Sequence, residues 1–157
     1  MIIKAQSLNQ ASFTPFGQVL EFSPDHPEPR DFAAKLFNDR PGAQPNLRVQ
    51  RHEPTPMPYM AILIERHRHS SQTFVPLSGG SYLIMVFLSD HDGNPVLESG
   101  LAFIGAGNQA INYNCDTWHH PFMVLNAPGT FLMLRWQDGT SGDEEFRPLP
   151  SPIHIQA

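Results

Sequence analysis

The stretch from Ile62 to Gly80 places acidic and imidazole side chains directly after an apolar run. The apolar residues from Tyr59 to Ile64 predict a buried strand, which continues into Glu65, His67 and His69. Because the side chains of an extended strand alternate between its two faces, these three residues would share one face. A carboxylate beside two imidazoles can transfer protons near neutral pH or bind a divalent metal ion. We therefore expect a functional site on this strand.

A second histidine cluster, WHHP, stands at positions 118–121. By the same alternation, one of His119 and His120 should point inward and the other outward. With His67 and His69, an inward histidine would supply three imidazoles, which are enough for a divalent transition metal. The alternative is that each histidine is a hydrogen-bonded structural residue, which is the more common role of a single histidine in a strand. Both interpretations stay open at this point.

The spacing of His67, His69, Gln72 and Gly79 resembles the first motif of the cupin superfamily, in which two histidines and a carboxylate face the interior of a β-barrel. Gln72 stands in place of the carboxylate. Its amide is a poor anionic ligand, but it can both donate and accept hydrogen bonds. The motif therefore predicts a polar site inside a barrel, with a metal ion as an option.

Short strands at close spacing must position these residues. The strands that we expect span residues 1–5, 18–22, 47–53, 59–64, 72–77, 81–88, 96–104, 110–113, 121–125 and 130–136. No alternating pattern of helices separates them, so the sequence predicts an antiparallel β-sandwich or barrel with one or two short helices. The resemblance to cupins narrows this fold class to an all-β, jelly-roll type barrel.

The remaining segments are mostly loops. Ser7 could cap a short helix from Gln10 to Phe13, and the segments 23–30 and 39–45 read as loops. Residues from Phe32 to Phe37 fit a strand or a helix equally well. We expect residues 1–157 to form one domain, in which the proline-rich segment 140–157 is a surface-wrapping tail.

The bulk composition excludes several classes of function. The chain has 157 residues and a formal net charge of -5, with its basic residues scattered, which argues against nucleic acid as a partner. Neither a signal peptide nor an apolar run near the roughly 20 residues of a membrane span is visible. The only cysteine, Cys115, permits no internal disulfide and fits a reducing compartment. We expect a cytoplasmic protein with no membrane partner.

Three blocks of sequence resemble the ureidoglycolate lyase family, formerly called ureidoglycolate hydrolase. They are FTPFGQVLE at 13–21, ERHRHSSQTFVPLSGG at 65–80 and INYNCDTWHHPF at 111–122. The chain departs from the family pattern at 68–69, 114–116 and 135–136. The resemblance implies a cupin-like barrel, commonly a homodimer, that cleaves ureidoglycolate to glyoxylate and urea in allantoin and purine breakdown.

The cleavage that this resemblance implies needs one base and one acid, and the expected pair is His67 and His119. Glu65 would orient His67 or act as the base itself. For substrate binding, Arg48 or Arg135 would hold the carboxylate of the small acid, and Gln72 and Ser78 would hold the ureido group. Trp118 and His120 complete the expected substrate contacts.

Two other mechanisms and functions compete with this one. The reaction could need no cofactor, or one divalent transition metal on His67, His69 and one of His119 and His120 could polarise the substrate hydroxyl. A metal-dependent cupin enzyme acting on a different small carboxylic acid, or a noncatalytic barrel that binds such an acid, would use the same residues.

Overall fold

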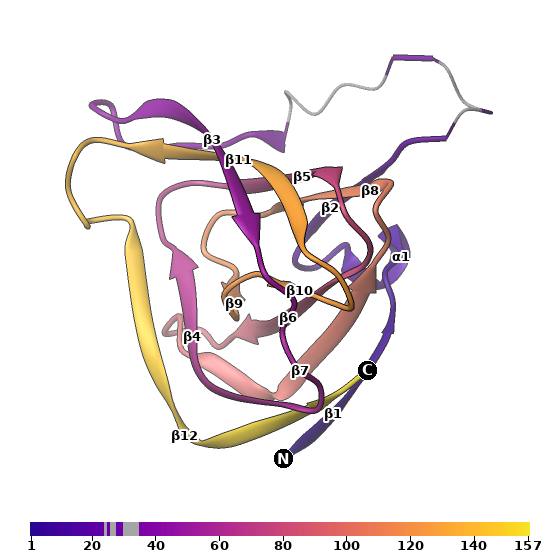
Figure 1. Ribbon diagram of the computed structural model, residues 1–157. Coiled ribbons are helices and arrows are strands. Elements are labelled where there is room, and N and C mark those ends of the chain that lie inside the picture. Colours follow the sequence, from indigo (N-terminus) through magenta and orange to yellow (C-terminus); the bar gives the residue numbers. More distant parts are fainter. Residues whose placement is uncertain (24, 26–27, 30–34) are drawn as a thin grey trace.

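A computed structural model describes residues 1–23, 25, 28–29 and 35–157. The described chain is almost entirely β-structure, and its one α-helix is short (Figure 1). The elements are β1 (Ile2–Ser7), α1 (Gln10–Phe13), β2 (Gly17–Glu21), β3 (Gln44–His52), β4 (Tyr59–His67), β5 (Gln72–Ser78), β6 (Tyr82–Ser89), β7 (Pro95–Gly105), β8 (Gln109–Tyr113), β9 (Trp118–His119), β10 (Met123–Val124), β11 (Gly129–Gln137) and β12 (Glu144–Gln156). The predicted all-β class is confirmed.

Two sheets build a cupin-like fold that is part sandwich and part barrel (Figure 1). The first sheet has the order β10-β6-β7-β1-β12-β4-β9, and β9 also pairs with β6, so the sheet closes on itself. The second sheet has the order β2-β8-β5-β11-β3. The pairing differs from a purely antiparallel barrel at one place, since β1 runs parallel to both β7 and β12.

Two apolar clusters form the core, and β6 contributes to both. Tyr82, Ile84 and Val86 pack between the two sheets, whereas Leu83 and Met85 pack inside the closed sheet. Alternation along an extended strand produces this division. Because both faces of β6 are buried, the strand reads in the sequence as a continuous apolar run.

Residues 140–157 contribute more than the expected surface-wrapping tail. Glu144–Gln156 forms β12, which lies between β1 and β4 in the closed sheet. Ile153 and Ile155 are buried in the core, while the register with β4 shifts between Pro148 and Ile153. The prolines of this segment therefore sit at an irregularity of a paired strand, a position that tolerates their missing N–H groups.

The short helix α1 spans Gln10–Phe13, as expected, but its cap lies two residues after the predicted one. Asn9, not Ser7, is the N-cap, and its side chain accepts a hydrogen bond from the backbone N–H of Ser12. Of the segment from Phe32 to Phe37, residues 32–34 lie outside the described residues. In the described part of the chain, no helix is long and apolar enough to cross a membrane.

Candidate active site

Strands β4 and β9 bring Glu65 and His119 together. The two residues are direct partners in the sheet, and Glu65 Oε1 lies 3.4 Å from His119 Nε2. His119 is buried, and its Nδ1 lies 2.8 Å from the carbonyl oxygen of Thr117. A carbonyl can only accept a hydrogen bond, so Nδ1 carries a proton and donates it to Thr117, which leaves Nε2 facing Glu65.

His67 has a different carboxylate partner. Its ring stacks beside that of His119 with centroids 5.9 Å apart, and its Nδ1 lies 3.3 Å from Oδ2 of Asp143. Glu65 was expected to orient His67, but the structure pairs Glu65 with His119 instead. The reason is the register of β4 with β9, which places Glu65 and His119 opposite each other. The site thus contains two carboxylate–imidazole pairs side by side.

Asp143 is held as an anion by its surroundings. Burial alone would raise the pKa of its carboxyl, but hydrogen bonds and charges outweigh that effect and hold the pKa well below its usual range. The contacts come from His67, from the Ser70 hydroxyl at 2.6 Å and from the backbone N–H of His69 at 2.8 Å. Arg40 adds a guanidinium nitrogen 3.4 Å away.

Glu65 also remains negatively charged. Burial raises the pKa of its carboxyl, yet the hydrogen bond and charge of His119, with the charges of His67 and His120, lower the pKa below its ordinary value overall. A carboxylate in contact with an imidazole can stabilise the ring in its protonated form, so the Glu65–His119 pair is suited to accepting a proton.

Two buried polar atoms near this pair, Gln72 Oε1 and the Tyr113 hydroxyl oxygen, have no hydrogen-bond partner among the described residues. His67 Nδ1 and His119 Nε2 each approach only a carboxylate, at 3.3 and 3.4 Å. Buried polar groups in proteins are nearly always paired, so a group of unpaired atoms needs an explanation. A site that receives a polar ligand provides one, because the ligand completes the missing hydrogen bonds.

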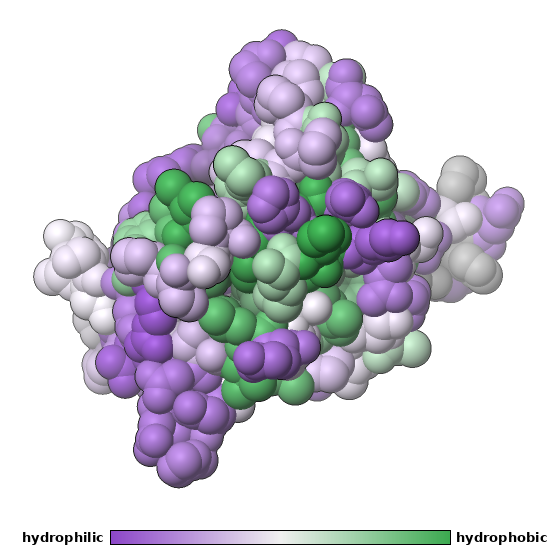
Figure 2. Space-filling view, turned by 90° about the horizontal axis from the view of Figure 1, so that it is seen from below, coloured by the Kyte–Doolittle hydropathy of each residue, from purple (hydrophilic) through white to green (hydrophobic). Residues whose placement is uncertain are grey.

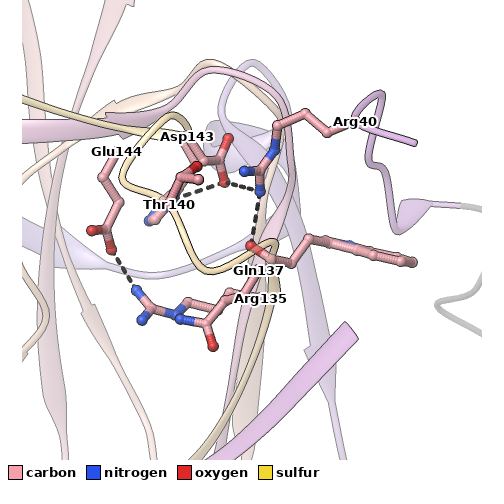
Figure 3. A pocket seen from close by; sticks show the side chains of 8 residues that line it. Arg40, Arg135, Gln137, Thr140, Asp143 and Glu144 are labelled. Carbon is pink, nitrogen blue, oxygen red and sulfur yellow. Dashed lines mark hydrogen bonds and ion pairs between the residues drawn. The ribbon is translucent and has the colours of Figure 1, made fainter. Parts of the chain in front are cut away.

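A pocket at the end of β11 reaches His67 from the outside (Figure 3). Its wall is polar and comprises Arg40, Arg135, Trp136, Gln137, Thr140, Asp143 and Glu144. The volume of about 40 Å³ leaves room for only a few water molecules, at roughly 10–15 Å³ for each. A small acid would therefore enter fully only if side chains of the wall moved.

The two arginines expected to bind a carboxylate lie on the inner face of the second sheet. Arg135 is partly buried and forms an ion pair with Glu144, as Figure 3 shows. Arg48 pairs in register with the buried Met133 of β11, so both side chains are on the same face. The Arg48 side chain is exposed and makes no hydrogen bond or ion pair with any described residue. Arg48 is therefore more available than Arg135 to bind the carboxylate of a substrate.

Gln72 lies where the sequence analysis expected it, but Ser78 and Trp118 do not. Gln72 is buried next to Tyr113 on the neighbouring strand. Ser78 is exposed at the opposite end of β5, six residues or about 20 Å away along the strand. Trp118 is fully buried inside the closed sheet, between the guanidinium groups of Arg66 and Arg147, because alternation directs it away from His119.

His69 and His120 also lie apart from the Glu65–His119 pair. Strand β4 ends at His67, so the expected alternation does not extend to His69, which is 40% exposed and contacts Asp39 at 3.0 Å. His120 is buried, with its Nδ1 2.7 Å from the Pro121 carbonyl and its ring against Tyr59. Burial lowers the pKa of His120. His119 and His120 are thus both buried, and their rings pack against different neighbours, Tyr113 of β8 and Tyr59 of β4.

Among the described residues, one group of side chains could hold a metal ion: Glu65, His67 and His119. One ligand atom from each lies within 4.8 Å of the others. Two imidazole nitrogens and a carboxylate suit a divalent transition metal, and the unpaired nitrogens of His67 and His119 are compatible with one. Compared with the expected ligands, Glu65 takes the place of His69 and His120.

Sequence reasoning missed Tyr113, Asp143 and Arg40. Asp143 and Arg40 lie in polar segments whose path across the molecule has no signature in the sequence. Tyr113 belongs to the INY block, but the sequence cannot reveal that its hydroxyl lacks a partner. Cys115, by contrast, is a spectator: it donates a weak hydrogen bond to the Arg68 carbonyl, and burial together with nearby carboxylates raises the pKa of its thiol to about 11.

Comparison with known proteins gives a consistent result. Residues 1–156 match the family described as ureidoglycolate lyase. A ureidoglycolate lyase of Mesorhizobium japonicum is 34% identical over 162 residues, covering 98% of both chains. Proteins of the same name from Pseudomonas syringae pv. syringae and Agrobacterium fabrum are 33% and 30% identical, over 90% and 92% of this chain and 87% and 90% of their own.

Proposed function

The chain belongs to the ureidoglycolate lyase family, and from this premise we propose that it cleaves ureidoglycolate to glyoxylate and urea. Of the features in the site, the juxtaposition of Glu65, His67 and His119 supports this function best. The proposal includes a role in allantoin and purine breakdown, which the family name implies. It also includes a cytoplasmic location, supported by the single free cysteine.

The reaction moves two protons and breaks one bond. Ureidoglycolate carries a hydroxyl, a carboxylate and a ureido nitrogen on the same carbon. Removal of the hydroxyl proton lets the oxygen form the aldehyde of glyoxylate, while the carbon–nitrogen bond breaks and its electron pair remains on the nitrogen. Protonation of that nitrogen releases urea. One base and one acid on opposite sides of the reacting carbon therefore suffice.

His119 is the proposed base. Its Nδ1 donates to the Thr117 carbonyl, so Nε2 is free to accept the hydroxyl proton. Glu65, 3.4 Å from Nε2, is the charge partner of the imidazolium that forms.

His67 is the proposed acid. Asp143 lies beside Nδ1 and is held as an anion, so it can fix the ring with Nδ1 protonated and stabilise the charged imidazole. The other nitrogen, Nε2, would then deliver a proton to the ureido nitrogen. Two stacked rings with separate carboxylate partners allow one to take up a proton while the other releases one.

The substrate carboxylate needs a cationic partner. Arg48 has a guanidinium group without a partner among the described residues, on the face of β3 that it shares with Met133. Arg135 is the second candidate, although Glu144 competes for its guanidinium group. A charge-assisted fork from either arginine would orient the substrate.

A metal ion would change the assignment of His67. If bound, the ion would be held by Glu65, His67 and His119, and it would supply Lewis-acid polarisation of the hydroxyl oxygen. His67 cannot be a ligand through the same nitrogen that donates the proton. The acid–base assignment and the metal assignment are therefore exclusive, and activity after treatment with a chelator separates them.

Replacement of the two histidines tests the proposal. The His67→Ala and His119→Ala variants should each lose roughly 10²–10⁴-fold in the enzymatic rate of glyoxylate and urea formation, because each removes a general acid or base. His91→Ala is the matched control, since His91 is 89% exposed in the loop after β6. Unchanged rates in both site variants would contradict the assignment of these histidines.

We also propose that the protein is a homodimer that associates through β3. This strand is the edge of the second sheet, and its outward side chains Leu47 and Val49 are more than 60% exposed. A long edge strand with exposed apolar side chains is usually covered in a stable protein. Figure 2 shows that apolar side chains also gather on the face of the molecule seen from below. Ile62 of β4 is an exposed apolar side chain as well, but its strand is paired on both sides.

A further inference from the structure

Tyr113 of β8 carries a hydroxyl group for which the fold provides no partner. The residue is 1% exposed, and its oxygen makes no hydrogen bond to any described residue. Tyr82, in the same apolar cluster and equally buried, shows the usual arrangement: its hydroxyl donates to the carbonyl oxygen of Gln109 at 2.8 Å. Buried tyrosines generally find such a partner, so Tyr113 is an exception within its own cluster.

Gln72 lies directly beside Tyr113 and is also incompletely paired. The two residues are register partners on β5 and β8, which places their side chains on the same face, with Cβ atoms roughly 4.5–5.5 Å apart. The amide nitrogen of Gln72 makes only a weak contact, 3.5 Å long, with the sulfur of Met133. The amide oxygen has no partner among the described residues. One unpaired donor and one unpaired acceptor are therefore neighbours.

The ring of Tyr113 also connects this pair with the acid–base residues. It stacks on the ring of His119, with centroids 4.2 Å apart and an angle of 14° between the planes. The phenolic hydroxyl of Tyr113 can donate a hydrogen bond, and the stacked ring lies beside the proposed base.

We propose that Tyr113 and Gln72 together recognise the ureido group, with Tyr113 as a specificity-determining residue. The Tyr113 hydroxyl donates a hydrogen bond to the ureido carbonyl oxygen, and the Gln72 amide oxygen accepts one from a ureido N–H. The inference rests on the proposed function and adds the part of the site that selects the leaving group.

The chemistry of the two groups selects this ligand. A ureido group presents a carbonyl acceptor next to N–H donors, which complements one donor beside one acceptor. A carboxylate presents only acceptors, so it would leave the Gln72 oxygen unpaired and next to negative charge. A site built to hydrogen-bond a substrate group discriminates strongly against analogues that lack the group, because its own buried atoms then stay unpaired.

Met133 provides a way to make room for this group. It is buried on β11 next to Gln72, and its side chain has three rotatable bonds and a polarizable sulfur. The contact between the Gln72 amide nitrogen and the Met133 sulfur is weak. Replacement of this contact by a hydrogen bond from Gln72 to the ligand is therefore favourable. Movement of the Met133 side chain would then open space over the inner face of β5 and β11.

Two variants that each remove one tyrosine hydroxyl test whether Tyr113 binds the substrate or only stabilises the fold. Tyr113→Phe should lower kcat/KM for ureidoglycolate by about 5- to 100-fold, which corresponds to the cost of one unpaired buried group. Its melting temperature should equal or exceed that of the wild type, because the lost hydroxyl has no partner. Tyr82→Phe should show the reverse, with a lower melting temperature and a nearly unchanged kcat/KM. Unchanged kcat/KM in Tyr113→Phe would overturn the inference.

Calorimetric titration with two unreactive acids separates this inference from the proposed function. Ureidoacetate keeps the carboxylate and the ureido group but lacks the hydroxyl, whereas glycolate keeps the carboxylate and hydroxyl but lacks the ureido group. Tyr113→Phe should bind ureidoacetate about 5- to 100-fold more weakly than the wild type and bind glycolate equally well. If the wild type forms no urea yet shows this difference, the proposed lyase function fails and the ureido site stands. Equal weakening for both acids, or no ureidoacetate binding by the wild type, would overturn the inference.

Discussion

At the scale of single residues, two carboxylates give two similar histidines different surroundings. Glu65 faces Nε2 of His119, whereas Asp143 faces Nδ1 of His67. Asp143 is further fixed by Ser70 and by the backbone of His69, so the second pair is the more rigidly held. This difference in carboxylate partners supports the proposal that one histidine starts the reaction as a base and the other as an acid.

Replacement of Glu65 should damage catalysis more than stability. Glu65→Gln keeps the shape of the side chain but removes the charge beside His119, so we expect kcat/KM to fall by roughly 10²-fold or more. Thermal melting should change little, because the variant no longer buries a charge. Steady-state kinetics measure the effect, and Glu53→Gln, whose carboxylate is 72% exposed, is the control. Wild-type kinetics in Glu65→Gln would remove Glu65 from the mechanism.

Asp143 should contribute to stability in a pH-dependent way. The pKa of its carboxyl is lowered in the folded protein, so its contribution is present above the ordinary aspartate value of about 3.9 and is lost as the pH falls toward the folded pKa. Asp143→Asn should therefore show a shallower decline of unfolding free energy below about pH 4. Denaturant titrations at about five pH values between about pH 3 and pH 7 would measure this decline.

The exposed Asp92 provides the comparison for that experiment. Asp92→Asn, in a loop where the carboxylate is 67% exposed, should keep the pH dependence of the wild type. If Asp143→Asn and the wild type declined in parallel below pH 4, Asp143 would not be a stabilising anion.

The sequence revealed the proposed reacting side chains better than the residues that support them. Glu65, His67 and His119 stand out because polar titratable groups follow apolar strand residues. Tyr113 and Asp143 could not be found in this way, since a tyrosine in an apolar strand reads as core and an aspartate in a polar segment reads as surface. Whether their polar atoms are paired depends on contacts between segments far apart in the chain.

At the scale of elements, a two-residue strand controls the site. Strand β9 lies between β4 and β6, and it positions His119 opposite Glu65 while directing Trp118 into the closed sheet. Most strands were predictable from their apolar alternation and turn residues. Strands β9 and β12 were not, because the first is too short to show a period and the second contains prolines that normally indicate a loop.

Close packing of β2 against β8 should make Gly17 irreplaceable. A Cβ at Gly17 would lie 2.0 Å from the carbonyl oxygen of Asn112, which is too close for any side chain. Gly17→Ala should therefore reduce the unfolding free energy by about 1–3 kcal/mol, measured by denaturant titration. Gly42→Ala is the control, because nothing lies within 4 Å of its added Cβ. Equal stability of the two variants would contradict this packing.

At the scale of the whole molecule, two sheets leave one long edge and two apolar surfaces uncovered. If β3 is the dimer contact, the wild type should sediment with twice the mass of one chain, and Val49→Glu should dissociate the dimer by placing a charge at the contact. Ile62→Glu, on the exposed face of β4, should remain dimeric. Dissociation by Ile62→Glu alone would move the contact to that face of β4.

The identity of the nitrogen product tests the central claim most directly. Wild-type protein is incubated with ureidoglycolate, and glyoxylate, urea and ammonia are measured over time against the spontaneous reaction. We predict equal amounts of glyoxylate and urea, formed faster than in the absence of protein, with no ammonia. Ammonia in place of urea, or no rate above the spontaneous one, would contradict the assignment of this chain as a ureidoglycolate lyase.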